Sequence, residues 1–297
     1  MKLVVKLMGG LGNQMFQYAA ARILAQKNDA ELVIDTWSGF IRDYQYRRSY
    51  ELNAFNISCS LASPIESIPF WIELAEKKIT KEVFGDISKH FYGSFIHELE
   101  NEFSENISNY KMRTSCWMTG YWQSSKYFNG NESLILNELM PPIPIDERFI
   151  QLGDKVRDVN SVALGVRLYE ESNNPDIHTS DGKLKSINKI NTAIYKLIEQ
   201  QEDLHFFVFC THRADILKKL EFRGSDVTYV TAEDGFIGTV ESLWLMTQCR
   251  HHIFTNSTFY WWGAWLSRSN YSVNEQMIFC ADNFVNKDTI DPHWSKF

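Results

Sequence analysis

The apolar and polar positions of the first 35 residues follow a strand, helix, strand pattern. Residues 3–8 form a short apolar run, a glycine-rich turn follows, residues 13–27 read as a helix, and residues 31–35 form a second apolar run. This pattern predicts a β-α-β unit. From there to about residue 109 the pattern is irregular and aromatic, with charged helical stretches near residues 73–82. We place no catalytic or binding residues in that region.

The second half of the chain alternates cleanly between strand-like and helix-like segments. The expected strands are residues 162–167, 206–210, 227–230, 252–255 and 277–281. The expected helices are residues 186–200, 214–220, 239–249 and 258–267. Such alternation predicts a parallel, doubly wound sheet. Ligands of these sheets bind beyond the carboxyl ends of the strands, where three segments of this chain carry polar side chains. They are Arg167, residues 210–212 and residues 256–258.

A proline cluster divides the two patterns. Pro141, Pro142 and Pro144 interrupt any helix and predict the end of a first lobe. We therefore expect two domains, residues 1–145 and residues 146–297, and a chain of 297 residues is long enough to give each its own core.

Composition narrows the class of protein. Hydrophobic residues make up 44% and charged residues 23%, which is ordinary for a globular protein. The net charge of −7 argues against a nucleic-acid partner, because binding phosphates requires an excess of Lys and Arg. No run approaches the ~18 apolar residues of a membrane span, so a cytoplasmic protein is expected. Peripheral association with the inner membrane and the oligomeric state are left open.

The sequence predicts no metal site. The five cysteines are odd in number, widely spaced and lack a Cys-x-x-Cys pair, so neither zinc nor a disulfide framework is indicated. The chain also has no Asp-x-Asp that would hold Mg²⁺ or Mn²⁺ against a pyrophosphate.

An anion site is predicted where the strand 252–255 meets the helix that begins near Thr258. Backbone N–H groups are unsatisfied at a helix N-terminus, the helix dipole is positive there, and Asn256, Ser257 and Thr258 add polar side chains. This arrangement suits a phosphate or pyrophosphate. The alternative is that Ser257 and Thr258 only cap the helix and that the tryptophans after them only fill a core.

The glycine-rich turn near the N-terminus partly matches a dinucleotide-binding fingerprint. It reads Gly10-Leu11-Gly12-Asn13-Gln14-Met15, and an aspartate, Asp35, ends the next strand. The third glycine of the fingerprint is replaced by Met15, whose long side chain would separate helix and strand. An NAD- or FAD-dependent enzyme remains an alternative.

Four motifs resemble one family. The chain carries NSTFYWWGAWL at residues 256–266, MGGLGNQMFQYA at residues 8–19, ESLWLMTQCRH at residues 241–251 and GYWQ at residues 120–123. Together they resemble the signatures of glycosyltransferase family 11, the α-1,2-fucosyltransferases. The resemblance spans nearly the whole chain.

The resemblance implies a GT-B-like α/β fold, two Rossmann-like lobes with a cleft between them. The N-terminal lobe would lie on the acceptor side and the C-terminal lobe would bind the nucleotide sugar. Backbone N–H groups of Gly10 and Gly12 and the amides of Asn13 and Gln14 would face sugar hydroxyls or the sugar-phosphate oxygen. Asn13 is accordingly a candidate catalytic residue.

The family's central motif, His-x-Arg-Arg-Gly-Asp-Tyr, survives only in part. The aligned segment is GVRLYEE at residues 165–171, which keeps the first arginine, Arg167, and places Gly165 at the histidine. The resemblance assigns Arg167 to the negative charge that develops on the β-phosphate. Glu170, at the aspartate position, is the best local candidate for a base. The alternative is a surface ion pair between Arg167 and a neighbouring glutamate.

The family's Phe-Ser-Asp-Asp segment is also changed. It reads FCTH at residues 209–212, so two carboxylates that could hold a base or ribose are missing. His212 is a candidate replacement contact, and an exposed histidine at a helix start is the alternative.

The function that follows from the resemblance is sugar transfer. The chain is expected to move L-fucose, or a related deoxyhexose, from GDP-fucose to a hydroxyl of an oligosaccharide, with inversion and without metal or cofactor. This is the activity of a galactoside α-1,2-fucosyltransferase. The alternatives are a catalytically silent nucleotide- or carbohydrate-binding protein and a transferase that uses another nucleotide sugar.

Overall fold

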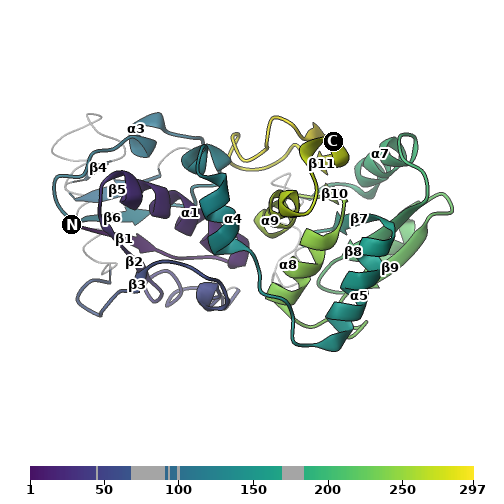
Figure 1. Ribbon diagram of the computed structural model, residues 1–297, viewed down its shortest axis with the longest axis horizontal. Helices are drawn as coiled ribbons and strands as arrows, with labels where there is room; N and C mark the ends of the chain where they lie inside the picture. The colour runs from purple at the N-terminus through teal and green to yellow at the C-terminus, as the bar shows by residue number, and fades with distance from the viewer. Residues whose placement is uncertain (45, 68–90, 93, 99–100, 169–183) are drawn as a thin grey trace. The chain divides into compact units, whose positions relative to one another are not determined.

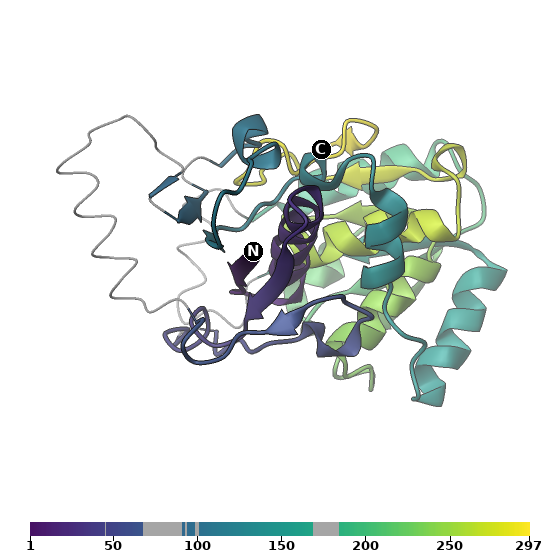
Figure 2. The ribbon, with the colours of Figure 1, turned by 60° about the vertical axis from the view of Figure 1, so that its left-hand side comes forward.

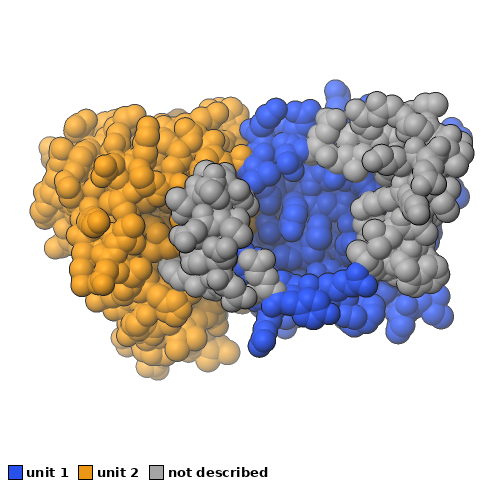
Figure 3. Space-filling model, turned by 180° about the vertical axis from the view of Figure 1, so that it is seen from behind, with its two compact units in different colours: residues 1–139, 285–289 blue, residues 140–284, 290–297 orange. Residues whose placement is uncertain are grey.

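A computed structural model describes residues 1–297 except 45, 68–90, 93, 99–100 and 169–183. The chain forms two compact units (Figure 3). Unit 1 comprises Met1–Leu139 and Val285–Thr289, and unit 2 comprises Met140–Phe284 and Ile290–Phe297. The division therefore falls at 139/140 and not at the expected 145/146. Residues 285–289, which we call the return segment, also belong to unit 1. Their packing against residues far away in the sequence is a long-range contact that no local pattern encodes.

Unit 1 is built on a six-stranded sheet with β1 next to its centre (Figure 1). In spatial order the strands are β3 (Ser60–Leu61), β2 (Glu31–Asp35), β1 (Lys2–Lys6), β6 (Cys116–Thr119), β5 (Phe95–His97) and β4 (Phe91–Tyr92). All neighbours are parallel except β4 and β5. The expected β-α-β unit is present, because α1 (Leu11–Lys27) connects β1 to β2.

Helix α1 also packs against α4 (Glu132–Leu139), and both views of the ribbon show the two side by side (Figures 1 and 2). The buried hydroxyl of Tyr18 donates a hydrogen bond of 2.6 Å to Glu138, and Arg22 pairs with the same carboxylate at 3.1 Å. A carboxylate buried here is tolerable because two donors satisfy it. The smaller elements of unit 1 are η1 (Leu52–Ala54), α3 (Glu105–Ser108) and η2 (Ser125–Phe128).

Unit 2 contains a second six-stranded sheet, all of whose neighbouring strands are parallel in the described residues. In spatial order the strands are β12 (Ser295–Lys296), β11 (Ile278–Cys280), β10 (His251–Phe254), β7 (Asn160–Gly165), β8 (Leu204–Phe209) and β9 (Asp226–Val230). The chain builds outward from β7 on one side, then crosses to β10 and builds outward on the other. This is the doubly wound order that the alternating pattern predicts, and its switch point lies between β7 and β10.

Helices cover both faces of this sheet. Val162 and Leu164 of β7 point toward α7, whereas the next residue in the alternation, Gly165, faces α9. The helices are α5 (Glu147–Asp158), α7 (Ile187–Ile198), α8 (Thr239–Gln248) and α9 (Thr258–Leu266). The expected helix at 214–220 is instead a 3₁₀ turn, η3 (Asp215–Lys219). The N–H of Leu217 donates to the carbonyl of Ala214 and that of Leu220 to the carbonyl of Leu217, which is the i→i+3 spacing of a 3₁₀ turn. Two further 3₁₀ turns follow α9, η4 (Ser267–Ser269) and η5 (Val273–Glu275).

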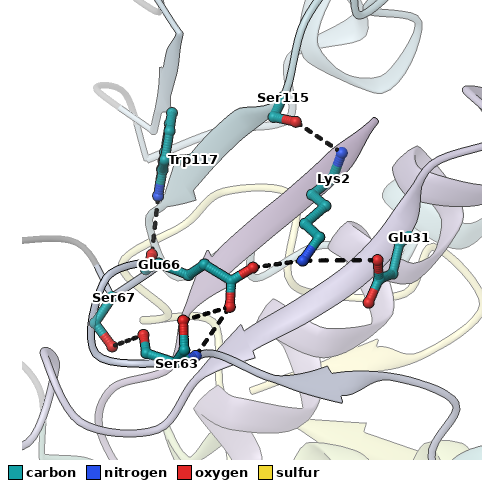
Figure 4. A network of polar contacts seen from close by, with 7 residues as sticks. All are labelled: Lys2, Glu31, Ser63, Glu66, Ser67, Ser115 and Trp117. Atoms are coloured by element: carbon teal, nitrogen blue, oxygen red, sulfur yellow. Dashed lines mark hydrogen bonds and ion pairs between the residues drawn. The ribbon is translucent and has the colours of Figure 1, made fainter.

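A polar network joins the amino ends of β1 and β6 to the loop after β3 (Figure 4). The Lys2 ammonium pairs with Glu66 and Glu31, and the Glu66 carboxylate accepts hydrogen bonds from the backbone and hydroxyl of Ser63. The hydrogen bond from Lys2 lowers the pKa of Glu66 to about 2. The network lies at the edge of the sheet opposite the glycine-rich turn, so we interpret it as structural. Separately, none of the helices described is both long and apolar enough to cross a membrane.

Candidate functional site

Three polar segments of unit 2 lie at the carboxyl ends of adjacent strands. Gly165 at the end of β7 lies opposite Phe209 of β8 and Phe254 of β10. Arg167, residues 210–212 and residues 256–258 follow these ends directly. The structure thus brings the three predicted segments to the switch point of one sheet, where doubly wound proteins bind their ligands.

The backbone of Arg167 is fixed by Thr255. Its N–H donates a hydrogen bond of 2.7 Å to the buried hydroxyl of Thr255, whose own N–H donates to the carbonyl of Gly165 at 3.0 Å. Thr255, which directly follows β10, therefore fixes the backbone position from which the Arg167 side chain extends. Arg167 itself is partly exposed. Thr255 is not among the residues predicted from the sequence, although a hydroxyl at the end of a buried strand is the available signal.

The ring of Tyr260 fills the space over Gly165. A Cβ atom at Gly165 would lie 2.4 Å from Cγ of Tyr260, far inside any real contact. The Tyr260 hydroxyl donates to the carbonyl of Phe209 at 3.0 Å, and that of Val166 lies 3.3 Å away. The position where the family pattern has histidine is therefore glycine in this chain, and a side chain from α9 occupies its place.

The N-terminus of α9 opens at the same edge of the sheet. Ser257 is the N-cap residue, but within the described structure its side chain makes no capping hydrogen bond. Ser257 and Thr258 are both partly exposed, and the Asn256 amide is held by the carbonyl of Asn283 at 2.9 Å. The capping alternative is therefore not supported for Ser257. The other half of that alternative is correct, because the tryptophans of α9 fill the core: Trp261, Trp262 and Trp265.

His212 lies in an exposed position after β8. Its Nδ1 is 3.0 Å from Oε1 of Glu233, and the neighbouring Arg213 pairs with Asp234 at 2.8 Å. Glu233 and Asp234 follow β9, the strand next to β8. Carboxylates are thus present at this edge although the segment after β8 has lost them. Sequence reasoning missed them because they come from a different loop. The predicted base, Glu170, lies outside the described residues.

The glycine-rich turn of unit 1 packs against the Asn13 residue that follows it. Gly9 has a φ of 77°, which favours glycine, and Gly10 is the N-cap of α1. The carbonyl of Gly10 accepts hydrogen bonds from the N–H groups of Asn13 and Gln14 at 2.9 and 3.1 Å. Gly12 is buried in the first turn of the helix.

The two predicted amides have different surroundings. Gln14 is fully buried and donates to the carbonyls of Gly9 and Ser49, while its oxygen accepts the N–H of Glu51. These bonds tie the segment after β2 to the turn, so Gln14 has a structural role. Asn13 is partly exposed, and its oxygen accepts a hydrogen bond of 3.0 Å from the amide of Gln123.

The bond between Asn13 and Gln123 joins two motifs from distant parts of the sequence. Asn13 follows β1 and Gln123 follows β6, and these strands are neighbours in the sheet. They meet at the switch point of unit 1, where the chain crosses from the β1–β2–β3 side to the β6 side. Each unit therefore has its polar motifs at the same topological position.

The family model for glycosyl transferase family 11 matches residues 1–296. The chain belongs to this family. It is 30% identical to an alpha-1,2-colitosyltransferase of Escherichia coli, over 89% of this chain and 87% of the relative. It is 29% identical to the O-antigen biosynthesis glycosyltransferase WbnK of the same species, over 88% of this chain and 89% of the relative. Family membership identifies the chain as a glycosyltransferase and leaves the dinucleotide alternative without support.

The fold has a solved counterpart. The crystal structure of NodZ alpha-1,6-fucosyltransferase soaked with GDP-fucose matches 89% of this chain and 92% of its own, with a TM-score of 0.50 and 15% identity. The two α/β sheets, parallel in the described residues except between β4 and β5, are thus the two Rossmann-like lobes that the motifs predict for a GT-B glycosyltransferase.

Proposed function

We propose that this chain transfers a 6-deoxyhexose of the L-fucose type from its GDP derivative to a hydroxyl of a glycan, with inversion and without a metal ion. The observation that carries the proposal is the switch point of unit 2, where Arg167 and the N-terminus of α9 lie at adjacent strand ends. Both are positive, and a departing nucleoside diphosphate is negative.

Each side chain has a role in this proposal. Ser257 and Thr258 donate to the diphosphate together with the first N–H groups of α9. Arg167 stabilises the charge that grows on the β-phosphate as the bond to the sugar breaks, through two parallel hydrogen bonds that a guanidinium can make. Unit 1 supplies Asn13 to the transferred sugar or the acceptor hydroxyl.

A second donor deserves equal testing because one relative is a colitosyltransferase. Colitose is L-fucose without the hydroxyl at C3, so the two GDP sugars differ by one hydrogen-bonding group. The acceptor of such an enzyme would be a glycan of the O-antigen kind, as the name of the second relative suggests.

The test is a comparison of donors. We expect GDP, GDP-fucose and GDP-colitose to raise the melting temperature more than UDP, dTDP or CMP and their sugars, because a ligand that binds the folded state stabilises it. EDTA should leave both binding and turnover unchanged. A larger shift with a UDP sugar, or loss of binding on chelation, would contradict the proposal. Binding without release of GDP in the presence of glycan acceptors or water would make the chain a silent binder.

The double variant Ser257→Ala, Thr258→Ala locates the diphosphate. Each lost hydrogen bond to a charged oxygen should weaken GDP binding by about 1.5–3 kcal/mol. Ser269→Ala is a matched control, because its hydroxyl bonds to the carbonyl of Leu266 at the other end of α9. Equal GDP affinity in the double variant and the control would mean that the diphosphate binds elsewhere.

A further inference from the structure

The return segment is hydrogen bonded to the motif that contains Gln123. The fully buried hydroxyl of Thr289 donates a hydrogen bond of 2.7 Å to the backbone carbonyl of Gln123. The carboxylate of Asp288 accepts the N–H of Phe103 at 2.8 Å and forms an ion pair with Lys126. These bonds hold the Gln123 carbonyl and the Lys126 side chain to the return segment.

The backbone just before Gln123 is strained. Trp122 is buried and has a φ of 55°, in the left-handed region that non-glycine residues rarely adopt. The carboxylate of Glu98 accepts the N–H groups of Tyr121 and Trp122 and so holds this conformation from one side. Strained conformations persist only where the surroundings over-determine them, and Thr289 supplies the constraint on the next residue.

Gln123 in turn determines how the Asn13 amide is oriented. An amide accepts through its oxygen and donates through its nitrogen. Because Nε2 of Gln123 donates to Oδ1 of Asn13, that oxygen is directed to Gln123, and Nδ2 of Asn13 lies over Gly9. A Cβ at Gly9 would come within 2.6 Å of this nitrogen, so the turn is shaped around the amide.

We propose that Thr289 and Gln123 are positioning residues for the transfer reaction, which set the orientation of the Asn13 amide in a hydrogen-bonded series from the return segment to the glycine-rich turn. The inference rests on the proposed function, in which Asn13 contacts the transferred sugar or the acceptor hydroxyl. Neither Thr289 nor Gln123 needs to touch substrate in this role, and neither belongs to the part of unit 2 that we assign to the nucleotide.

The first test removes the hydroxyl that begins the series. Thr289→Val should lower kcat on the order of 10- to 100-fold, because a small misplacement of a contacting group has that effect, while the Kd for GDP stays unchanged. Thr289→Ser keeps the hydroxyl and should restore turnover. Thr247→Val is a matched control, since Thr247 is equally buried and donates to the carbonyl of Trp244 over the same 2.7 Å, in unit 2.

The second test reverses the bond at Asn13. Gln123→Glu replaces the donor with an acceptor of the same shape, so the Asn13 amide must turn over to remain hydrogen bonded. We expect kcat to fall as far as in Asn13→Ala, with the melting temperature and the Kd for GDP near those of the unmodified chain. A purely structural Gln123 would change the melting temperature and leave kcat intact.

Hydrogen exchange separates this inference from the proposed function. Amides of residues 10–17 should exchange faster in Thr289→Val than in Thr247→Val, whether or not a donor has been found. If no GDP sugar is turned over by the unmodified chain, the proposed function fails and the exchange result alone decides the inference. Exchange and kcat equal to those of Thr247→Val would overturn the positioning role.

Discussion

At the scale of single residues, Arg167 is the group to which the proposed reaction assigns the largest role. It is the only arginine kept from the central family motif, and Thr255 fixes its backbone at the switch point of unit 2. A guanidinium offers a planar pair of donors, whereas a lysine ammonium offers the same charge at one point.

Arg167→Lys should therefore lower kcat nearly as much as Arg167→Ala does. We expect kcat to fall by about 10²–10³ in both, the loss seen when a preorganised charge stabiliser is removed. Turnover and melting temperature should be measured on the same samples. Arg223→Lys is the control, because Arg223 stacks on Tyr195 at 3.6 Å and precedes β9, at the opposite edge of the sheet. Normal turnover in Arg167→Lys would show that charge alone is sufficient and would remove the bidentate role.

At the scale of elements, the contact between β7 and α9 shows how the chain accommodates its altered motif. The ring of Tyr260 lies directly against Gly165, and its hydroxyl donates to the carbonyl of Phe209 at the end of β8, close to the carbonyl of Val166 just after β7. Helix α9, whose N-terminus we propose binds the diphosphate, is thereby held against the strand that leads to Arg167. Any side chain at Gly165 must displace this ring.

Gly165→Ala should accordingly lower the free energy of unfolding of unit 2 by about 1–3 kcal/mol, as overpacking does in a closely packed interior. The measurement is chemical denaturation. In a Tyr260→Ala background the same substitution should cost much less, because the ring with which it collides is gone. Equal costs in the two backgrounds would mean that the strain lies elsewhere.

Strand β10 contains a histidine whose hydrogen bonds require its neutral form. Nδ1 of His251 accepts the N–H of Met277 at 3.0 Å, so its Nε2 donates to the Asn160 side chain at 3.1 Å. Burial, assisted by the nearby Arg250, lowers the pKa of His251 to about 4 from its ordinary 6.5. A proton on Nδ1 would face the N–H that it now accepts.

This arrangement predicts acid sensitivity. The unfolded chain binds a proton at His251 below about pH 6.5, whereas the folded chain does not until about pH 4. Stability is therefore complete above pH 6.5 and falls as pH decreases toward 4, by up to about 3 kcal/mol from this one residue. Urea denaturation at several pH values should show a shallower decline in His251→Gln, which can make both bonds without titrating. An unchanged slope would contradict the assignment.

At the scale of the whole molecule, the features that could be predicted from the sequence are the helices and strands that depend on local pattern. The helix expected at 239–249 is α8 (Thr239–Gln248), and the strand expected at 227–230 is β9 (Asp226–Val230), because periodicity and turn residues are local signals. The motifs likewise placed polar side chains at the strand ends. What local pattern could not reveal is pairing across the fold: Tyr260 over Gly165, Glu233 beside His212, and Thr289 on Gln123.

The return segment has a consequence for synthesis of the protein. The ribosome makes residues 1–139 first and residues 285–289 only after nearly all of unit 2. Domains usually fold as they emerge, N-terminal first, but here the nascent unit 1 lacks Asp288 and Thr289 until most of unit 2 has been synthesised. Lys126 therefore lacks its ion-pair partner Asp288, and the Gln123 carbonyl lacks its hydrogen-bond donor Thr289, while unit 2 is being synthesised. The hydrogen bonds around Gln123 are thus completed only after unit 2 has been synthesised, although Gln123 itself is synthesised before it.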